Sequence, residues 1–392
     1  MNLLQKLREY AKRGAYPMHM PGHKRNMTFA NGLPFDIDIT EIHGFDDLHD
    51  PRGVLLEIAQ RGASLYGAAS ALSLVNGSTV GILAAIRAAV GGEYGAGSLV
   101  CSRYSHRAVT NAASLCGLRT VFVTPPNDAD SGIIGSVTPE MIADALEAAP
   151  DTVAVVLTSP TYDGVVSDVA AIAELTHARD IPLIVDAAHG AHFGLSDTFP
   201  KNATRLGADI EIVSLHKTLP SMTQTSLLLV GDNSRVAVDA IARQLRVFQT
   251  SSPSYVLMSS IENCVSTLAS PDFRQKLFRD YESALGELSQ SLSRLKHLRR
   301  VDRAECFFGY DPGKIVISTL HADITGGELA ERLRSLGFEV ETHSDTHVLA
   351  MTSVADTRRA LMRFADALLK IDATLNAADK TVRTIVPLGV DV

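Results

Sequence analysis

Lys217 lies in a hydroxyl-rich segment between two apolar, β-branched runs, Ile210 to Val213 and Leu227 to Val230. Such runs are typical of buried strands, so we expect the lysine on a loop where one strand leaves the core and another re-enters it. An ammonium group on a partly buried loop loses hydration, its pKa falls, and the neutral amine can attack a carbonyl carbon. A lone lysine in a polar turn is more often an ordinary surface residue, so other segments must decide its role.

A turn of small residues suits a phosphate group. Gly77, Ser78 and Thr79 follow a short strand-like run, Ala71 to Val75, and precede an apolar helical pattern, Val80 to Val90. The free N–H groups and the positive dipole end of a helix favour an anion at such a turn. By itself, the pattern also fits a glycine turn with a serine N-cap.

Two further side chains could bind a ligand together with Lys217 and the turn at Gly77. Asp186 ends an apolar run, and a buried carboxylate needs a partner such as a protonated ring nitrogen. His106 opens a helix after another run, where its imidazole could stack on an aromatic ring. With Lys217 for an aldehyde and the turn for a phosphate, the set predicts a site for pyridoxal 5'-phosphate. No metal site is expected.

The elements that would position these residues alternate along the chain. Candidate strands are Ser98 to Ser102, Thr120 to Thr124, Val153 to Thr158, Leu183 to Asp186, Glu211 to Ser214 and Ser226 to Val230. Helical patterns between them are His106 to Cys116, Pro139 to Ala149 and Val169 to Ala178. This alternation predicts a parallel sheet covered by helices on both faces, with ligands at the carboxyl ends of the strands.

The second half of the chain indicates more helix and a smaller α/β unit. Helices are expected at Val54 to Tyr66, at Val236 to Phe248, after the break Thr250 to Tyr255 through Leu268, after Pro271 to Leu295, at Gly327 to Leu336 and at Val354 to Leu375. Strands of the smaller unit are expected at Cys306 to Phe308, Ile315 to Ser318, Phe338 to Glu341 and His347 to Thr352. We predict an N-terminal arm and interface loop (1–53), a large cofactor-binding domain (54–268) and a small C-terminal α/β domain (269–392), which ends in a short tail from Asp379.

Composition narrows the class of protein. The 392 residues carry a net charge of −8 and have no long basic run, which argues against a nucleic-acid partner. Four widely spaced cysteines fit free thiols in a reducing compartment. The first residues place Leu3, Leu4, Leu7 and Ala11 on one helical face, as in a docking helix, and no apolar run is long enough to span a membrane. We therefore expect a cytoplasmic protein without a membrane partner.

Seven segments carry a resemblance to a known family. The segments MPGHKRN, DITEIHGFDDLHDPRG, LVNGSTVG, SRYSHRAV, TSPTYDG, VDAAHGAHF and SLHKTLPSMTQTS run in the family's order from about residue 17 to 255, and the smaller unit matches more loosely. The chain resembles fold-type I pyridoxal-phosphate enzymes and, more closely, the shorter bacterial members of the ornithine/lysine/arginine decarboxylase family. The resemblance implies an aspartate-aminotransferase-like α/β fold of type I, with a mostly parallel sheet in the large domain.

The resemblance also implies residue roles. Lys217 would bond to the cofactor aldehyde, Asp186 would pair with the pyridine nitrogen, and His106 would stack on the ring. The remaining cofactor contacts would come from Gly77, Ser78, Thr79, Ser159, Thr161, His189, Ser214 and His216. Ser252, in the segment TSSPSY, resembles part of a loop at the neighbouring subunit's site, which implies a homodimer with shared active sites.

The implied reaction is decarboxylation of lysine, ornithine or arginine, with His189, His216 or Lys217 returning a proton to the product. Glu341 and Asp345 could receive the distal basic group of the substrate, although such acids are more often solvated loop residues. Two alternatives stay open: another fold-type I enzyme, such as a transaminase or carbon–sulfur lyase, and a catalytically silent cofactor-binding paralogue. No arginine stands out as the α-carboxylate clamp that transaminases usually need.

Overall fold

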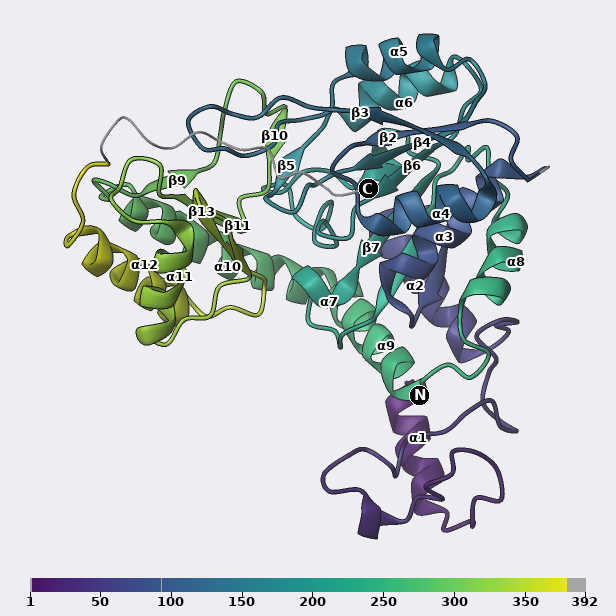
Figure 1. Cartoon of the computed structure of the whole chain (residues 1–392). Helices are drawn as coiled ribbons and strands as arrows, with labels where there is room; N and C mark the ends of the chain where they lie inside the picture. Colours follow the sequence, from purple (N-terminus) through teal and green to yellow (C-terminus); the bar gives the residue numbers. More distant parts are fainter. Residues whose placement is uncertain (1, 93, 379–392) are drawn as a thin grey trace.

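A seven-stranded sheet lies at the centre of the larger part of the protein (Figure 1). A computed structural model describes residues 2–92 and 94–378. In sheet order the strands are β1 (Ser70–Leu74), β8 (Ser226–Val230), β7 (Ile210–Ser214), β6 (Leu183–Asp186), β4 (Thr152–Thr158), β2 (Ser98–Ser102) and β3 (Arg119–Val123). Strands β7, β6, β4, β2 and β3 are parallel, and β8 runs antiparallel to both β1 and β7. The expected mostly parallel sheet is confirmed.

Side chains that alternate along each strand enter two separate cores. On β4, Val155 and Leu157 join one core while Ala154 and Val156 join the other, because successive side chains of a strand point to opposite faces. The core that contains Val155 is covered by α2 (Val54–Tyr66), α5 (Pro139–Ala148), α6 (Val169–His177) and α9 (Tyr255–Ala269). The core that contains Ala154 is covered by α3 (Gly77–Val90), α4 (Arg107–Cys116) and α8 (Val238–Phe248).

A second sheet of four antiparallel strands follows in the chain. Its order is β12 (Thr342–His343), β13 (His347–Met351), β11 (Lys314–Ser318) and β9 (Arg299–Val301). It lies at the left of Figure 1 with α10 (Pro271–Leu292), α11 (Gly326–Ser335) and α12 (Arg358–Asp372). A two-stranded sheet of β5 (Val165–Val166) and β10 (Gly309–Tyr310) joins the segment after β4 of the first sheet to the segment between β9 and β11 of the second sheet. The predicted domain boundaries at residues 53 and 268 stay predictions.

The amino-terminal helix α1 (Leu3–Lys12) docks on α9, as its apolar spacing predicts. Leu3 and Leu7 are fully buried, and a capping box formed by Asn2 and Gln5 starts the helix. The described elements also include two short 3-10 helices, η1 (Met27–Phe29) and η2 (Ala203–Leu206). Within residues 2–92 and 94–378, no helix combines the length and apolar character that crossing a membrane requires.

Several predicted elements of the second unit are wrong. The predicted strand Cys306 to Phe308 is a turn, and pairing begins one residue later in β10. The predicted strand Phe338 to Glu341 is irregular, and β12 comes directly after it. The helix expected from Val354 begins only at α12, because the Thr357 side chain caps the N–H group of Ala360. The expected tail from Asp379 lies outside the described residues.

Close packing of α3 on the sheet gives a prediction for stability. A Cβ atom on Gly81 would lie 2.7 Å from Leu74 Cδ1 and 3.1 Å from Ile212 Cγ2, both in the buried core. Replacing Gly81 by Val should lower the free energy of unfolding by about 1–3 kcal/mol in urea titrations, because the core is overpacked. The matched variant Gly286→Val, at an exposed helix position with no atom within 4 Å of a Cβ, should stay within about 0.5 kcal/mol of the wild type. Equal effects of the two variants would contradict the packing argument.

Candidate active site

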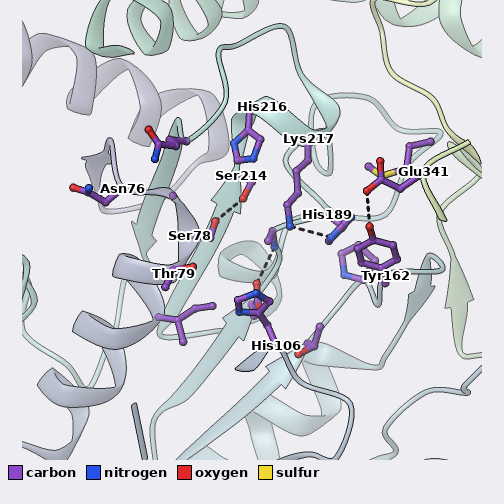
Figure 2. A pocket seen from close by; sticks show the side chains of 18 of the residues that line it. Asn76, Ser78, Thr79, His106, Tyr162, His189, Ser214, His216, Lys217 and Glu341 are labelled. Carbon is purple, nitrogen blue, oxygen red and sulfur yellow. Dashed lines mark hydrogen bonds between the residues drawn. The ribbon is translucent and has the colours of Figure 1, made fainter. Parts of the chain in front are cut away.

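A cavity of about 700 Å³ lies at the carboxyl ends of β1, β2, β4, β6 and β7 (Figure 2). Its volume is within the range typical of small-molecule sites. The lining side chains that sequence analysis singled out are Gly77, Ser78, Thr79, His106, Asp186, His189, Ser214, His216, Lys217 and Glu341. The cavity is completed by Asn76, Ile82, Tyr104, Thr158, Pro160, Tyr162, Ala188, Gln224 and Met351. The parallel strands thus bring side chains from distant segments to one edge.

One end of the cavity is suited to an anion. Helix α3 begins at Gly77, and its N-cap residue Asn76 makes no side-chain hydrogen bond to the first turn. Gly77 has φ of 73° and no atom within 4 Å of a Cβ position, so backbone groups can be approached closely there. The hydroxyls of Ser78 and Ser214 lie 2.6 Å apart, which joins this turn to the end of β7. First-turn N–H groups and hydroxyls together form a phosphate-binding arrangement.

Asp186 is a buried carboxyl group at the end of β6. Its side chain is only 3% exposed, and its Oδ1 accepts the N–H of Ala188 at 3.1 Å. Burial raises the pKa of Asp186, while the Ala188 hydrogen bond, Lys217 and His106 oppose that rise. A cationic hydrogen-bond donor in the cavity would stabilise the carboxylate.

Two histidines are held by hydrogen bonds that determine their tautomers. His106 caps α4, and its Nδ1 accepts the N–H of Ala108 at 3.1 Å, so the proton of the neutral ring lies on Nε2. Burial lowers the pKa of His106, which favours this neutral form. His216 donates from Nδ1 to the carbonyl oxygen of Thr225 at 3.0 Å. Its neutral ring therefore presents an unprotonated Nε2.

Lys217 is on α7 (Leu215–Thr218), a single helical turn where sequence analysis expected a loop. Its Nζ lies 3.0 Å from Nε2 of His189. Figure 2 marks this contact with a dashed line. Burial lowers the pKa of Lys217, while the charges of Asp186 and Glu341 oppose that change. Lys217 and Asp186 line the same cavity, as the predicted constellation requires.

Two residues that sequence analysis did not single out complete the surroundings of His189. Tyr162 donates its hydroxyl to Glu341, and its ring centroid lies 4.7 Å from that of His189. Lys314, at the start of β11, is 1% exposed and places Nζ 2.8 Å from Nδ1 of His189. The segment TSPTYDG contained Tyr162, but Lys314 precedes an ordinary apolar strand pattern, which gave no indication that it would be buried.

Four expected contributors do not line the cavity. The Ser159 hydroxyl accepts the N–H of Ser167 at 3.1 Å, and the Thr161 hydroxyl accepts the N–H of Val165 at 3.0 Å. Both hydroxyls therefore hold the local backbone. Ser252 is exposed on the segment before α9, and Asp345 lies in the turn before β13. The catalytic and binding roles of the lining residues stay predictions.

The sequence matches a known family over most of its length. Residues 2–308 match the family model described as Orn/Lys/Arg decarboxylase, major domain. The chain belongs to this family. Among its relatives, the uncharacterized protein YaaO of Bacillus subtilis (strain 168) is 36% identical over 363 residues, covering 91% of this chain and 75% of the relative. An arginine decarboxylase of the same organism is 29% identical over 391 residues, covering 96% and 78%.

Solved structures support the fold of this Orn/Lys/Arg decarboxylase family member. The constitutive lysine decarboxylase of E. coli matches with a TM-score of 0.77 at 22% identity, covering 95% of this chain. The Francisella novicida lysine decarboxylase LdcF matches with a TM-score of 0.82 at 17% identity. This chain spans 60% of the length of each of these two structures. The predicted α/β fold, aspartate-aminotransferase-like fold type I, is confirmed.

The buried carboxyl group predicts a conflict between stability and function. Burial raises the pKa of Asp186 in the folded chain above its value in the unfolded chain. Between these two pKa values the folded chain keeps a proton that the unfolded chain has lost. The free energy of unfolding therefore falls as pH rises through this interval, and the ionised carboxylate destabilises the fold at neutral pH. Asp186→Asn should raise the unfolding free energy of the cofactor-free chain at pH 7 by about 1–3 kcal/mol, measured by urea denaturation. The control Asp151→Asn, at an exposed carboxylate paired with Arg119, should give no increase. Destabilisation by Asp186→Asn would contradict this reading.

Proposed function

We propose that the chain is a pyridoxal-phosphate-dependent decarboxylase that converts lysine, ornithine or arginine to the corresponding amine and carbon dioxide. The observation that carries this proposal is that Lys217, Asp186 and the turn at Gly77 line one cavity, with Glu341 on its wall. An amine, a buried acid and an anion site match the three recognition points of the cofactor, and Glu341 offers a partner for a basic substrate. Membership in a decarboxylase family supports the reaction type.

The lining residues fit the cofactor by their chemistry. Helix α3 starts without a side-chain cap, so the turn at residues 77–79 would hold the phosphate with the hydroxyl of Ser214. The ring of His216 would assist only with a proton on Nε2 as well, because an unprotonated Nε2 cannot donate to a phosphate. Asp186 would pair with the pyridine nitrogen, because a buried carboxyl with one backbone donor gains from a cationic partner. His106 would cover the face of the cofactor ring. The orientation of its imidazole is held because its Nδ1 accepts the N–H of Ala108 at the start of α4. When bound, the cofactor supplies an electron sink for the bond broken at the substrate α-carbon.

Side chains of the protein would carry out the proton transfers. Lys217 needs a neutral amine to bond to an aldehyde, and burial favours that form because it lowers the lysine pKa. Lys217 Nζ and Nε2 of His189 lie 3.0 Å apart, close enough for a direct proton transfer. His216 presents its Nε2 to the same cavity, since its Nδ1 donates to Thr225. Lys217 and His189 are our candidates for returning a proton to the α-carbon after carbon dioxide leaves, and His216 joins them only when its Nε2 also carries a proton.

Glu341 would select the substrate by its charge. The Tyr162 hydroxyl donates to the Glu341 carboxylate, which leaves acceptor capacity on that carboxylate for a distal ammonium or guanidinium group. Glu341 lines the cavity together with Lys217, whereas Asp345 does not. We therefore assign the distal group of the substrate to Glu341 alone.

We further propose that the functional form is a homodimer. Large apolar side chains of the amino-terminal segment face solvent in the single chain: Tyr16 is 72% exposed, Met18 85% and Met20 65%. A second copy would cover these side chains, and Ser252, exposed on its segment, would then contribute to the neighbouring site.

Replacing Lys217 by Ala tests the central assignment. The variant should lose the visible absorbance of the lysine-bound cofactor and release carbon dioxide at least about 1,000-fold more slowly, because no other amine replaces it at the aldehyde. Carbon dioxide and amine release from lysine, ornithine and arginine should be measured beside 2-oxoglutarate-dependent amino transfer.

The control for this experiment is Lys276→Ala, an exposed lysine paired with Asp280. It should keep both signals of the wild type. Retention of the absorbance and the turnover by Lys217→Ala would refute the assignment. Amino transfer without carbon dioxide release in the wild type would replace the decarboxylase by a transaminase, and the absence of both would favour a silent cofactor-binding protein.

A matched pair of substitutions tests substrate recognition. Glu341→Gln removes a charge from the cavity wall, and it should raise the KM for a basic amino acid about 10- to 100-fold with a smaller change in kcat. Asp345→Asn removes the same charge from a nearby turn outside the cavity and should leave the KM unchanged. Steady-state kinetics with the preferred amino acid measure both values. Equal KM changes in the two variants would indicate a general charge effect instead of a specific contact.

A further inference from the structure

Tyr162 and Glu341 meet at the cavity, although they come from different parts of the fold. Tyr162 lies in the turn between β4 and β5, whereas Glu341 directly precedes β12 of the second sheet. The Tyr162 hydroxyl donates to Oε1 of Glu341, a contact that Figure 2 marks with a dashed line. Both side chains line the cavity and both are exposed, Tyr162 by 43%. The pair therefore borders the side of the cavity that is open to solvent.

The position of the Tyr162 hydroxyl is held by the fold around it. The N–H of Val165 donates to the side-chain oxygen of Thr161 at 3.0 Å, and the N–H of Thr161 donates to the carbonyl oxygen of Val165 at 2.8 Å, which closes the turn. The Tyr162 ring packs edge-on against His189, with ring centroids 4.7 Å apart. The contact with Glu341 is thus made by a hydroxyl that its own surroundings direct.

Glu341 is held by the second sheet. Its N–H donates to the carbonyl oxygen of Leu349 on β13 at 2.9 Å, next to the first pair of residues in β12 and β13. Among the described residues that line the cavity, the acids are Asp186 and Glu341. Since Asp186 is the proposed partner of the cofactor ring, Glu341 is the carboxylate left for the distal group of a substrate.

The Tyr162 hydroxyl makes the two oxygens of this carboxylate unequal. Each carboxylate oxygen has about two lone-pair positions, and Oε1 uses one of them for Tyr162. The described residues place no hydrogen-bond donor on Oε2 of Glu341. A ligand therefore finds full acceptor capacity on Oε2 and reduced capacity on Oε1.

This difference matters because the two kinds of distal group bind a carboxylate differently. A guanidinium group binds best with two parallel N–H donors, one to each oxygen, so its second donor would have to share Oε1 with Tyr162. An ammonium group is a compact charge with three donors on one nitrogen. It can donate to Oε2 alone and leave its other N–H groups to water on the open side of the cavity.

We propose that Tyr162 is a specificity-determining residue: by donating to Oε1 of Glu341, it weakens the two-point contact with a guanidinium group and favours substrates with a distal primary ammonium group. Lysine and ornithine have such a group, and arginine does not. The inference rests on the proposed function, because it concerns the distal end of the same substrate. Tyr162 acts through Glu341, and no bond other than hydrogen bonds is formed or broken in this role.

Steady-state kinetics of the holoenzyme test the preference. In the wild type, kcat/KM for the better of lysine and ornithine should exceed that for arginine at least about 10-fold, the effect of one hydrogen bond to a charged group. Tyr162→Phe keeps the ring and removes the hydroxyl, and it should reduce this preference about 5- to 10-fold, mainly through a lower KM for arginine. A wild type that prefers arginine would overturn the inference and leave decarboxylation itself intact.

A double substitution shows whether the hydroxyl acts through the carboxylate. In a Glu341→Gln background, Tyr162→Phe should change the preference less than about 2-fold, because the acceptor that the two distal groups compete for has lost its charge. An equal effect of Tyr162→Phe in both backgrounds would contradict the proposal. The control is Tyr94→Phe, which removes a hydroxyl from a side chain that is 76% exposed and does not line the cavity. It should leave the preference unchanged.

Binding of amines tests the same contact without turnover. The diamines derived from lysine and ornithine, and the aminoguanidine derived from arginine, should be titrated into the holoenzyme by calorimetry. The better diamine should bind the wild type at least about 5-fold more tightly than the guanidine compound, and Tyr162→Phe should remove most of this difference. Equal affinities in the wild type, no binding of either amine, or an unchanged ratio in the variant would overturn the proposal. A wild type that releases no carbon dioxide but shows the expected binding ratio would refute the proposed function and retain the role of Tyr162.

Discussion

The shared carboxyl edge of the parallel strands is the constraint on which this structure depends. Strands that run in one direction end on one side of the sheet, so every turn that follows them reaches the same region. Asp186 and Lys217 follow neighbouring strands, while Ser78 comes from β1 farther along the same edge. The antiparallel strand β8 carries the chain back from this edge after Lys217. Residues far apart in sequence therefore meet at one edge of the sheet.

Burial of ionisable groups gives the site its chemical character. Removing Asp186 and Lys217 from water disfavours the charged form of each, so the ligand-free site is poised to gain from an ionic partner. Burial of these two groups also lowers the stability of the fold. The two sheets meet here as well, because His192 and Asp311 form a buried pair at 3.1 Å beside the contact between His189 and Lys314. The arrangement of the second sheet therefore influences the electrostatics of the first.

Prediction from sequence succeeded where one strong local signal was present. The strands of the large sheet are continuous apolar runs, and the turn at Gly77 and the lysine at 217 follow such runs, so their placement at strand ends could be inferred. It failed where the decisive factor was a partner distant in sequence. The short strand β10 pairs with β5, which lies far earlier in the sequence, so no local pattern reveals it.

The sequence by itself determined the class of fold, the order of its strands and helices, and the family to which the chain belongs. These follow from periodicity and from motifs that are local in the chain. The tertiary structure decided which side chains share the cavity, which tautomers the histidines adopt, and that Lys314 is buried against His189. Protonation and burial depend on distances and on exclusion of water, and both are properties of the packed molecule that no local sequence pattern contains.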